Sequence, residues 1–163
     1  MKIAFTGHRP NRLGGFGPKA KGILQAYAKR VLLPLDPEIN IVQGCALGWD
    51  LAVAKEAIEQ GHKVISCIPV LGYNAKWPMD AVWELEGVLN KSHKVEIVNT
   101  GPYCPKALNE RNKFMVDMSD ELWALCAEVP SGSLSCVMYA EKQSKSVKHL
   151  WRQWLTFKER QCA

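Results

Sequence analysis

One local pattern recurs along the chain: a short apolar run ends in a turn of small and polar residues, and a helix-like segment follows. The clearest case is the run 39–42, which breaks at 43–48 and leads into the alanine-rich segment 49–60. A short, continuous apolar run is typical of a strand buried on both faces, and strands that alternate with helices are typical of βαβ units. The pattern therefore predicts an α/β fold with a mostly parallel sheet.

The same pattern extends over the chain and predicts a Rossmann-like three-layer sandwich, with right-handed crossovers and helices on both faces of the sheet. No internal repeat or linker divides the sequence, so we expect a single domain over 1–163, with 152–163 as a helical tail. Strands are expected at 2–5, 39–42, 63–68, 94–98, 121–127 and 147–151, and helices at 19–33, 49–60, 75–89, 106–118 and 134–142.

Composition restricts where the protein works and what it binds. No apolar run approaches the roughly 20 residues that span a bilayer, and no signal peptide precedes the first strand, so we expect a cytoplasmic protein without a membrane partner. The six cysteines form no C-x-x-C pair, which predicts reduced thiols and neither a zinc site nor a disulfide framework. We expect no cofactor and no metal. The net charge of +5 would suit an anionic partner, but no nucleic-acid motif accompanies it, which favours a solvated basic face.

In an open parallel sheet, ligands bind beyond the carboxyl ends of the strands, so the turns there become the candidate site. The first turn contains Thr6, Gly7, His8 and Arg9, which offer a hydroxyl, an accessible backbone, an imidazole and a guanidinium to a phosphate or ribose. The alternative is structural: Arg9 would pair with a local carboxylate and His8 would cap the strand. Composition leaves both open.

The second turn places Gly44, Cys45 and Gly48 between a strand and a helix, where backbone N–H groups and the helix dipole favour an anion. Asp50 stands in the first turn of that helix, either stabilising its dipole or acting in catalysis. Trp49 is expected in the core, with stacking on a base as the alternative.

The third turn carries Ser131, Gly132 and Ser133, whose hydroxyls suit phosphate oxygens, although a serine N-cap explains them as well.

The order and spacing of these three turns, with 109–115 and Ser119–Asp120, resemble the SLOG superfamily, named for Smf/DprA and the LOG phosphoribohydrolases, and within it the YpsA-like branch. The resemblance implies a Rossmann-like fold that holds nucleotides or their derivatives, with Arg111 matching an arginine of the LOG site. The implied ligand-binding residues are Thr6, Gly7, His8, Arg9, Gly44, Cys45, Gly48, Asp50, Arg111, Ser131, Gly132 and Ser133.

The LOG enzymes use a Gly-Gly-x-Gly-Thr-x-x-Glu turn to cleave the base–ribose bond, and the sequence departs from it. After the third turn the next acid is Glu141, about two helical turns further on. The catalytic residues are therefore unassigned, with Asp50 and Glu110 as the candidates to replace the glutamate. Asp120 either contacts ligand hydroxyls or caps a loop.

The missing glutamate favours a binding protein over an enzyme. We expect it to bind a nucleotide or nucleotide-derived signalling ligand, cyclic forms included, and to sequester that ligand in a bacterial or phage conflict setting. The first alternative is a hydrolase of the LOG type that cleaves an N-glycosidic bond, and the second is a protein associated with single-stranded DNA. We also expect a homo-oligomer, with contacts near Trp83 and 151–154.

Overall fold

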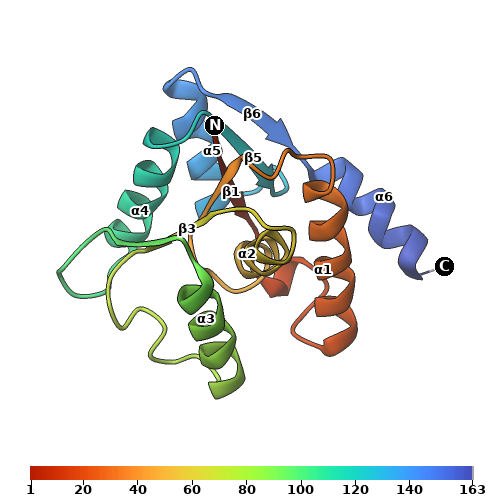
Figure 1. The fold of residues 1–163 in the computed structure, drawn as a ribbon, viewed down its shortest axis with the longest axis horizontal. Coiled ribbons are helices and arrows are strands. Elements are labelled where there is room, and N and C mark those ends of the chain that lie inside the picture. Colours follow the sequence, from red (N-terminus) through yellow and green to blue (C-terminus); the bar gives the residue numbers. More distant parts are fainter. Residues whose placement is uncertain (163) are drawn as a thin grey trace.

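A six-stranded, fully parallel sheet forms the centre of the molecule in the computed structural model, which describes residues 1–162. The strand order is β4-β3-β2-β1-β5-β6, so the sequence steps away from β1 in one direction and then returns to its other side (Figure 1). The α/β, Rossmann-like fold is thus confirmed. The strands are β1 (Lys2–Gly7), β2 (Asn40–Gln43), β3 (Val64–Ile68), β4 (Lys94–Ile97), β5 (Glu121–Leu125) and β6 (Ser146–His149).

Alternate residues of the inner strands enter two different cores, as the period of two in a strand requires. On one side Ile3 and Phe5 of β1 pack with Trp123 of β5. On the other side Ala4 of β1 packs with Leu122 of β5. Helices cover both faces, which is why these strands read as continuous apolar runs rather than alternating ones.

The helices divide between the two faces in the way the two cores indicate. Buried residues of α1, α2, α3 and α6 belong to the first core, and those of α4 and α5 to the second. Figure 1 shows α4 and α5 on one side of the sheet and α1 and α6 on the other. The helices are α1 (Pro18–Leu32), α2 (Trp49–Glu59), α3 (Met79–Lys91), α4 (Pro105–Asp117), α5 (Gly132–Lys142) and α6 (Trp151–Cys162), with one 3-10 turn at Pro10–Arg12.

Most expected boundaries lie within two residues of those observed, and two of the differences affect the description of the fold. The third helix begins at Met79 rather than 75, because Pro78 disfavours helical backbone at the residue before it and 75–77 form turns instead. The last strand ends at His149, and Trp151 already starts α6. The expected tail is therefore a helix packed on the first core through Trp154, which is 1% exposed; its final residue, Ala163, lies outside the described residues.

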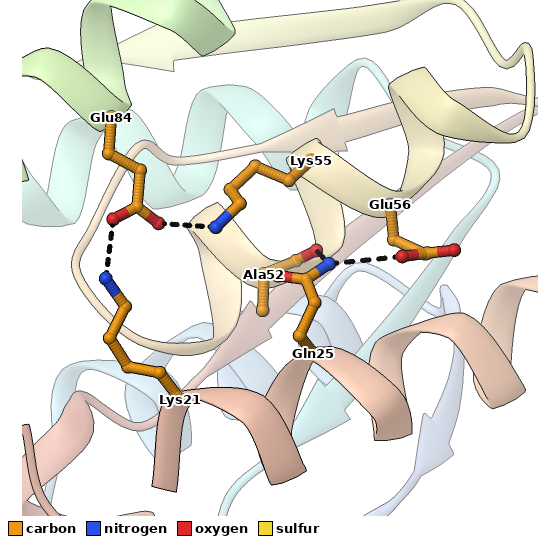
Figure 2. A network of polar contacts seen from close by, with 6 residues as sticks. All are labelled: Lys21, Gln25, Ala52, Lys55, Glu56 and Glu84. Atoms are coloured by element: carbon orange, nitrogen blue, oxygen red, sulfur yellow. Dashed lines mark hydrogen bonds and ion pairs between the residues drawn. The ribbon is translucent and has the colours of Figure 1, made fainter. Parts of the chain in front are cut away.

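A polar network joins three of the four helices that cover the first core (Figure 2). Glu84 of α3 accepts hydrogen bonds from Lys21 of α1 at 2.8 Å and from Lys55 of α2 at 3.0 Å. Gln25 of α1 donates to the Ala52 carbonyl at 3.0 Å and to Glu56 at 3.2 Å. These contacts fix α1 and α3 against α2, the helix that follows the second predicted turn.

Two general features of the described chain bear on its expected setting. No helix within residues 1–162 has the length and apolar character needed to cross a membrane. All six cysteines are free thiols, and four of them are buried.

Candidate functional site

A cavity of about 420 Å³ opens at the carboxyl edge of the sheet, where β1 and β5 are adjacent although they are distant in the sequence. This is the point at which the strand order reverses, the usual ligand position in such folds. Its wall comes from the loop after β1, the start of α2, the first half of α4 and the start of α5. The lining includes Thr6, Gly7, His8, Arg9, Asn11, Arg12, Asp50, Asn109, Arg111, Asn112, Ser131, Gly132 and Ser133.

Arg111 is the most unusual of these residues, because it is a guanidinium with only 6% of its surface exposed. It projects from α4, and its Nη1 donates to the Gly44 carbonyl beyond β2, while its Nε donates to Asn112 Oδ1 at 2.9 Å. Within residues 1–162 no salt bridge joins Arg111 to a carboxylate. A guanidinium has five N–H donors, so donors remain for a ligand.

The second turn supports Arg111 rather than the cavity. A Cβ on Gly44 would lie 2.9 Å from both Arg111 Cζ and Asp50 Oδ2, so only glycine fits between these side chains. Cys45 is fully buried with a φ of 58°, and its N–H donates to Gln43 Oε1 at 2.6 Å. Gly48 has a φ of 93° and packs on the His8 carbonyl. Gly44, Cys45 and Gly48 are therefore not among the lining residues.

Asp50, in contrast, lines the cavity from the first turn of α2. Its Oδ2 accepts a hydrogen bond from the Ala46 N–H at 3.3 Å. Burial raises the pKa of this carboxyl to about 6, although the nearby charge of Arg111 opposes the rise. A carboxyl that titrates near neutrality in a cavity is suited to hold or release a proton there.

The other acidic candidates lie elsewhere. Glu110 pairs with Lys106 across 3.8 Å along α4 and does not line the cavity. Asp120 stands at the amino end of β5, the opposite edge of the sheet, where it accepts from the Lys2 N–H at 2.7 Å and donates its own N–H to the Lys2 carbonyl at 2.8 Å. Its role is therefore to cap the loop.

The first turn combines a structural histidine with an exposed arginine. His8 Nε2 accepts from the Ala127 N–H at 2.9 Å, which ties this turn to the loop after β5. Burial, together with the charge of Arg12, lowers the pKa of His8, so the ring is neutral at pH 7. Arg9 is solvent-exposed, lines the cavity and forms no salt bridge within residues 1–162.

Gly7 lies over a core tryptophan. A Cβ at this position would stand 2.4 Å from Trp49 Cδ1. Trp49 is fully buried, with its ring centroid 5.6 Å from that of Tyr27, so it belongs to the core.

The third turn forms the amino end of α5. Ser131 is its N-cap, since its hydroxyl accepts from the Leu134 N–H at 3.1 Å. Asn112 of α4 reaches the Gly132 carbonyl at 3.4 Å and so connects the two helices. Ser133 is 8% exposed. The N–H groups of a first helical turn lack partners within the helix, and the helix dipole gives that end a positive potential.

A second cavity of about 300 Å³ adjoins the first and was not anticipated from the sequence. Tyr73 and Trp77 from the segment after β3, with Tyr103 from the loop after β4, supply aromatic walls. The rings of Tyr73 and Trp77 meet edge to face at 5.4 Å, and the Tyr73 hydroxyl donates to the Cys45 carbonyl at 2.6 Å. The available signal was three aromatic residues in loops that follow the carboxyl ends of two strands.

Comparisons with known proteins agree with this architecture. A UPF0398 protein of Bacillus cereus (strain B4264) is 24% identical over 170 residues, which cover 98% of this chain and 92% of that protein. DNA processing protein A from Helicobacter pylori, whose solved structure concerns its single-stranded DNA binding mode, superposes with a TM-score of 0.64 at 21% identity. That match covers 91% of this chain and 64% of the other, so this chain spans slightly less than two thirds of the Helicobacter protein.

A further solved structure, the molybdenum cofactor binding protein of Rippkaea orientalis, superposes with a TM-score of 0.57 at 18% identity and covers 91% of this chain and 74% of its own. At these identities the two structures show a shared fold. The model of one family, DNA recombination-mediator protein A, matches residues 19–162. That match includes nearly all of the chain and agrees with the resemblance to the SLOG superfamily, so the chain belongs to the DNA recombination-mediator protein A family.

Proposed function

We propose that this protein binds a phosphate-bearing nucleotide or nucleotide-derived ligand in the cavity at the carboxyl edge and holds it without chemical change. The observation that carries the proposal is the pair Arg9 and Arg111, which line one cavity and form no salt bridge within residues 1–162. Arg111 is buried and, although the Asp50 carboxyl lies near it, forms no salt bridge with that carboxyl, so an anionic ligand would add a direct ionic partner.

The rest of the lining fits the other parts of a nucleotide. The amino end of α5 would add N–H donors to the phosphate, as helix termini do in many phosphate sites. Asn11, Asn109 and Asn112 supply amides for ribose hydroxyls, and the aromatic cavity offers ring faces to a base. Two proteins of this fold are described as binding single-stranded DNA and molybdenum cofactor, which supports ligand binding in general terms.

The first test is mass spectrometry of small molecules released when the purified protein is denatured, followed by calorimetric titration with the molecule found. We expect an intact nucleotide, at least tenfold weaker binding to Arg9→Ala protein, and unchanged binding to Arg160→Ala protein, which loses an exposed arginine outside both cavities. Equal affinity in the Arg9 and Arg160 variants would reject the proposed site.

Intact release is also what sequestration of a signalling ligand requires. A protein of this kind removes its ligand from solution in proportion to its own concentration, with no turnover. We propose that this sequestration serves in a conflict between bacteria and phages, where removal of a signalling ligand would block the response to that signal.

A second function is favoured by Asp50 alone. A carboxyl with a pKa near 6 that lines the cavity is suited to act as a general base, as hydrolysis of an N-glycosidic bond requires. Free base that appears during incubation with a nucleoside monophosphate, and disappears with Asp50→Asn protein, would establish the hydrolase in place of the binding protein.

A further inference from the structure

The two cavities at the carboxyl edge meet at a common wall. Four residues line both cavities: Arg9, Ala46, Leu108 and Arg111. The two guanidiniums therefore lie where the cavities join. The cavity with hydrogen-bonding side chains is on one side of them, and the cavity with aromatic rings is on the other. This arrangement places the positive charge in the middle of the combined site.

We propose that the ligand has two heads joined by a phosphate or pyrophosphate bridge. The aromatic head, a base, occupies the cavity of Tyr73, Trp77 and Tyr103. The second head, a sugar or nucleoside, occupies the cavity of asparagine and serine side chains, and the bridge lies between Arg9 and Arg111. This inference rests on the proposed function, because it assigns the ligand class of the same site.

The sizes of the cavities support two heads over one. Small-molecule sites commonly measure roughly 300–1,000 Å³. The aromatic cavity, at about 300 Å³, and the polar cavity, at about 420 Å³, each stand at the low end of that range. A ligand with one head in each cavity would therefore occupy the whole combined site, whereas a nucleoside monophosphate would occupy only part of it.

The linings of the two cavities also differ, and each suits a different head of the ligand. Tyr103 is 52% exposed, so its ring is available to a ligand, and Trp77 and Tyr73 extend the same wall. The polar cavity instead brings together Asn11, Asn109 and the hydroxyls at the start of α5, which suit the several hydroxyl groups of a sugar. The base would thus contact aromatic rings, and the sugar would contact hydrogen-bonding side chains.

A comparison of one two-headed molecule with its halves tests the inference. ADP-ribose contains AMP and ribose 5-phosphate as its two parts, so calorimetric titration with all three measures each head separately. We expect ADP-ribose to bind at least tenfold more tightly than either half, and Arg9→Ala to weaken all three.

Two surface variants assign the heads. Tyr103→Ala should weaken ADP-ribose and AMP more than ribose 5-phosphate, and Asn109→Ala should weaken ADP-ribose and ribose 5-phosphate more than AMP. The matched controls are Tyr139→Ala on α5 and Asn90→Ala on α3, which lie outside both cavities and should bind like the parent protein.

The possible failures are distinct. In one outcome AMP binds as tightly as ADP-ribose, Arg9→Ala weakens the binding of AMP, and Asn109→Ala changes neither affinity. This outcome would overturn the two-headed ligand but would leave the proposal of nucleotide binding intact. No measurable binding of any of the three would overturn both proposals. An ADP-ribose affinity that Tyr103→Ala and Asn109→Ala leave unchanged would place the heads outside these cavities and would overturn the inference as well.

Discussion

Asp50 shows how folding changes a single side chain. Burial raises its pKa from 3.8 to about 6, so ionised Asp50 destabilises the folded protein. This loss of folding free energy is absent below about pH 4, where Asp50 is protonated in both the folded and the unfolded protein. It grows as the pH rises and is complete above about pH 6. The rise corresponds to about 3 kcal/mol. Unfolding in urea should therefore show that Asp50→Asn gains stability over the parent protein as pH increases from about 4 to 7.

The control for this titration is Asp80→Asn, which removes an exposed carboxylate from the first turn of α3. Its stability relative to the parent protein should stay constant over the same range. A gain for Asp50→Asn that is equally large at about pH 4 would show that ionisation is not its cause.

The close packing around Gly44 leads to a second prediction for a single residue. Gly44→Ala would insert a methyl group between Arg111 and Asp50, and overpacking of this kind costs about 1–3 kcal/mol. We expect a lower melting temperature and weaker nucleotide binding together, because the displaced side chain is Arg111. Gly87→Ala is the comparison: no atom lies within 4 Å of its new Cβ, and alanine in a helix should raise stability by about 0.5–1 kcal/mol.

At the level of elements, Glu84 joins α1, α2 and α3. Burial raises its pKa, but the hydrogen bonds and charges of Lys21 and Lys55 outweigh this, and the net pKa is lowered. Its contribution is therefore present above about pH 4.5 and is lost as pH falls. Because the lysines are partly exposed, Glu84→Gln should cost only about 0.5–1 kcal/mol at pH 7 and less near pH 3.5, as measured by urea unfolding.

The comparison for Glu84 is Glu86→Gln, an exposed glutamate of the same helix, which should lower stability less at pH 7. A loss for Glu84→Gln that is the same at both pH values would point to packing instead of charge.

The elements themselves were largely predictable, because buried parallel strands leave continuous apolar runs and the turns between strand and helix contain glycine. The side chains at the site were less so. Gly44 and Gly48 belong to a glycine turn that looks like a phosphate loop, yet the Gly44 carbonyl accepts a hydrogen bond from Arg111 and Gly48 packs on the His8 carbonyl. Whether such a turn binds a ligand or supports the fold depends on contacts with residues that are distant in the sequence. Arg111, for example, lies more than 60 positions from Gly44.

At the level of the whole molecule, self-association stays a prediction. Of the two regions expected to form the contact, the structure favours the one around Trp83. Trp154 is buried in the core, whereas Trp83 on α3 is 65% exposed. Large exposed aromatic residues are enriched at interfaces. We expect sedimentation velocity to show an oligomer that Trp83→Ser shifts toward monomer, whereas Met138→Ser, at a residue 60% exposed on α5, has no effect. A parent protein that sediments as a monomer would end the prediction.

The position of β5 beside β1 has a consequence for the newly made chain. Gly7 pairs with Leu125 and lines the cavity, and the lining also includes Ser131 and Ser133 at the start of α5. A ribosome must therefore translate about four fifths of the protein before the pocket exists, and contacts this distant in sequence form slowly. A nascent chain shorter than that should therefore not retain the proposed ligand, which would bind only after the start of α5 has been made.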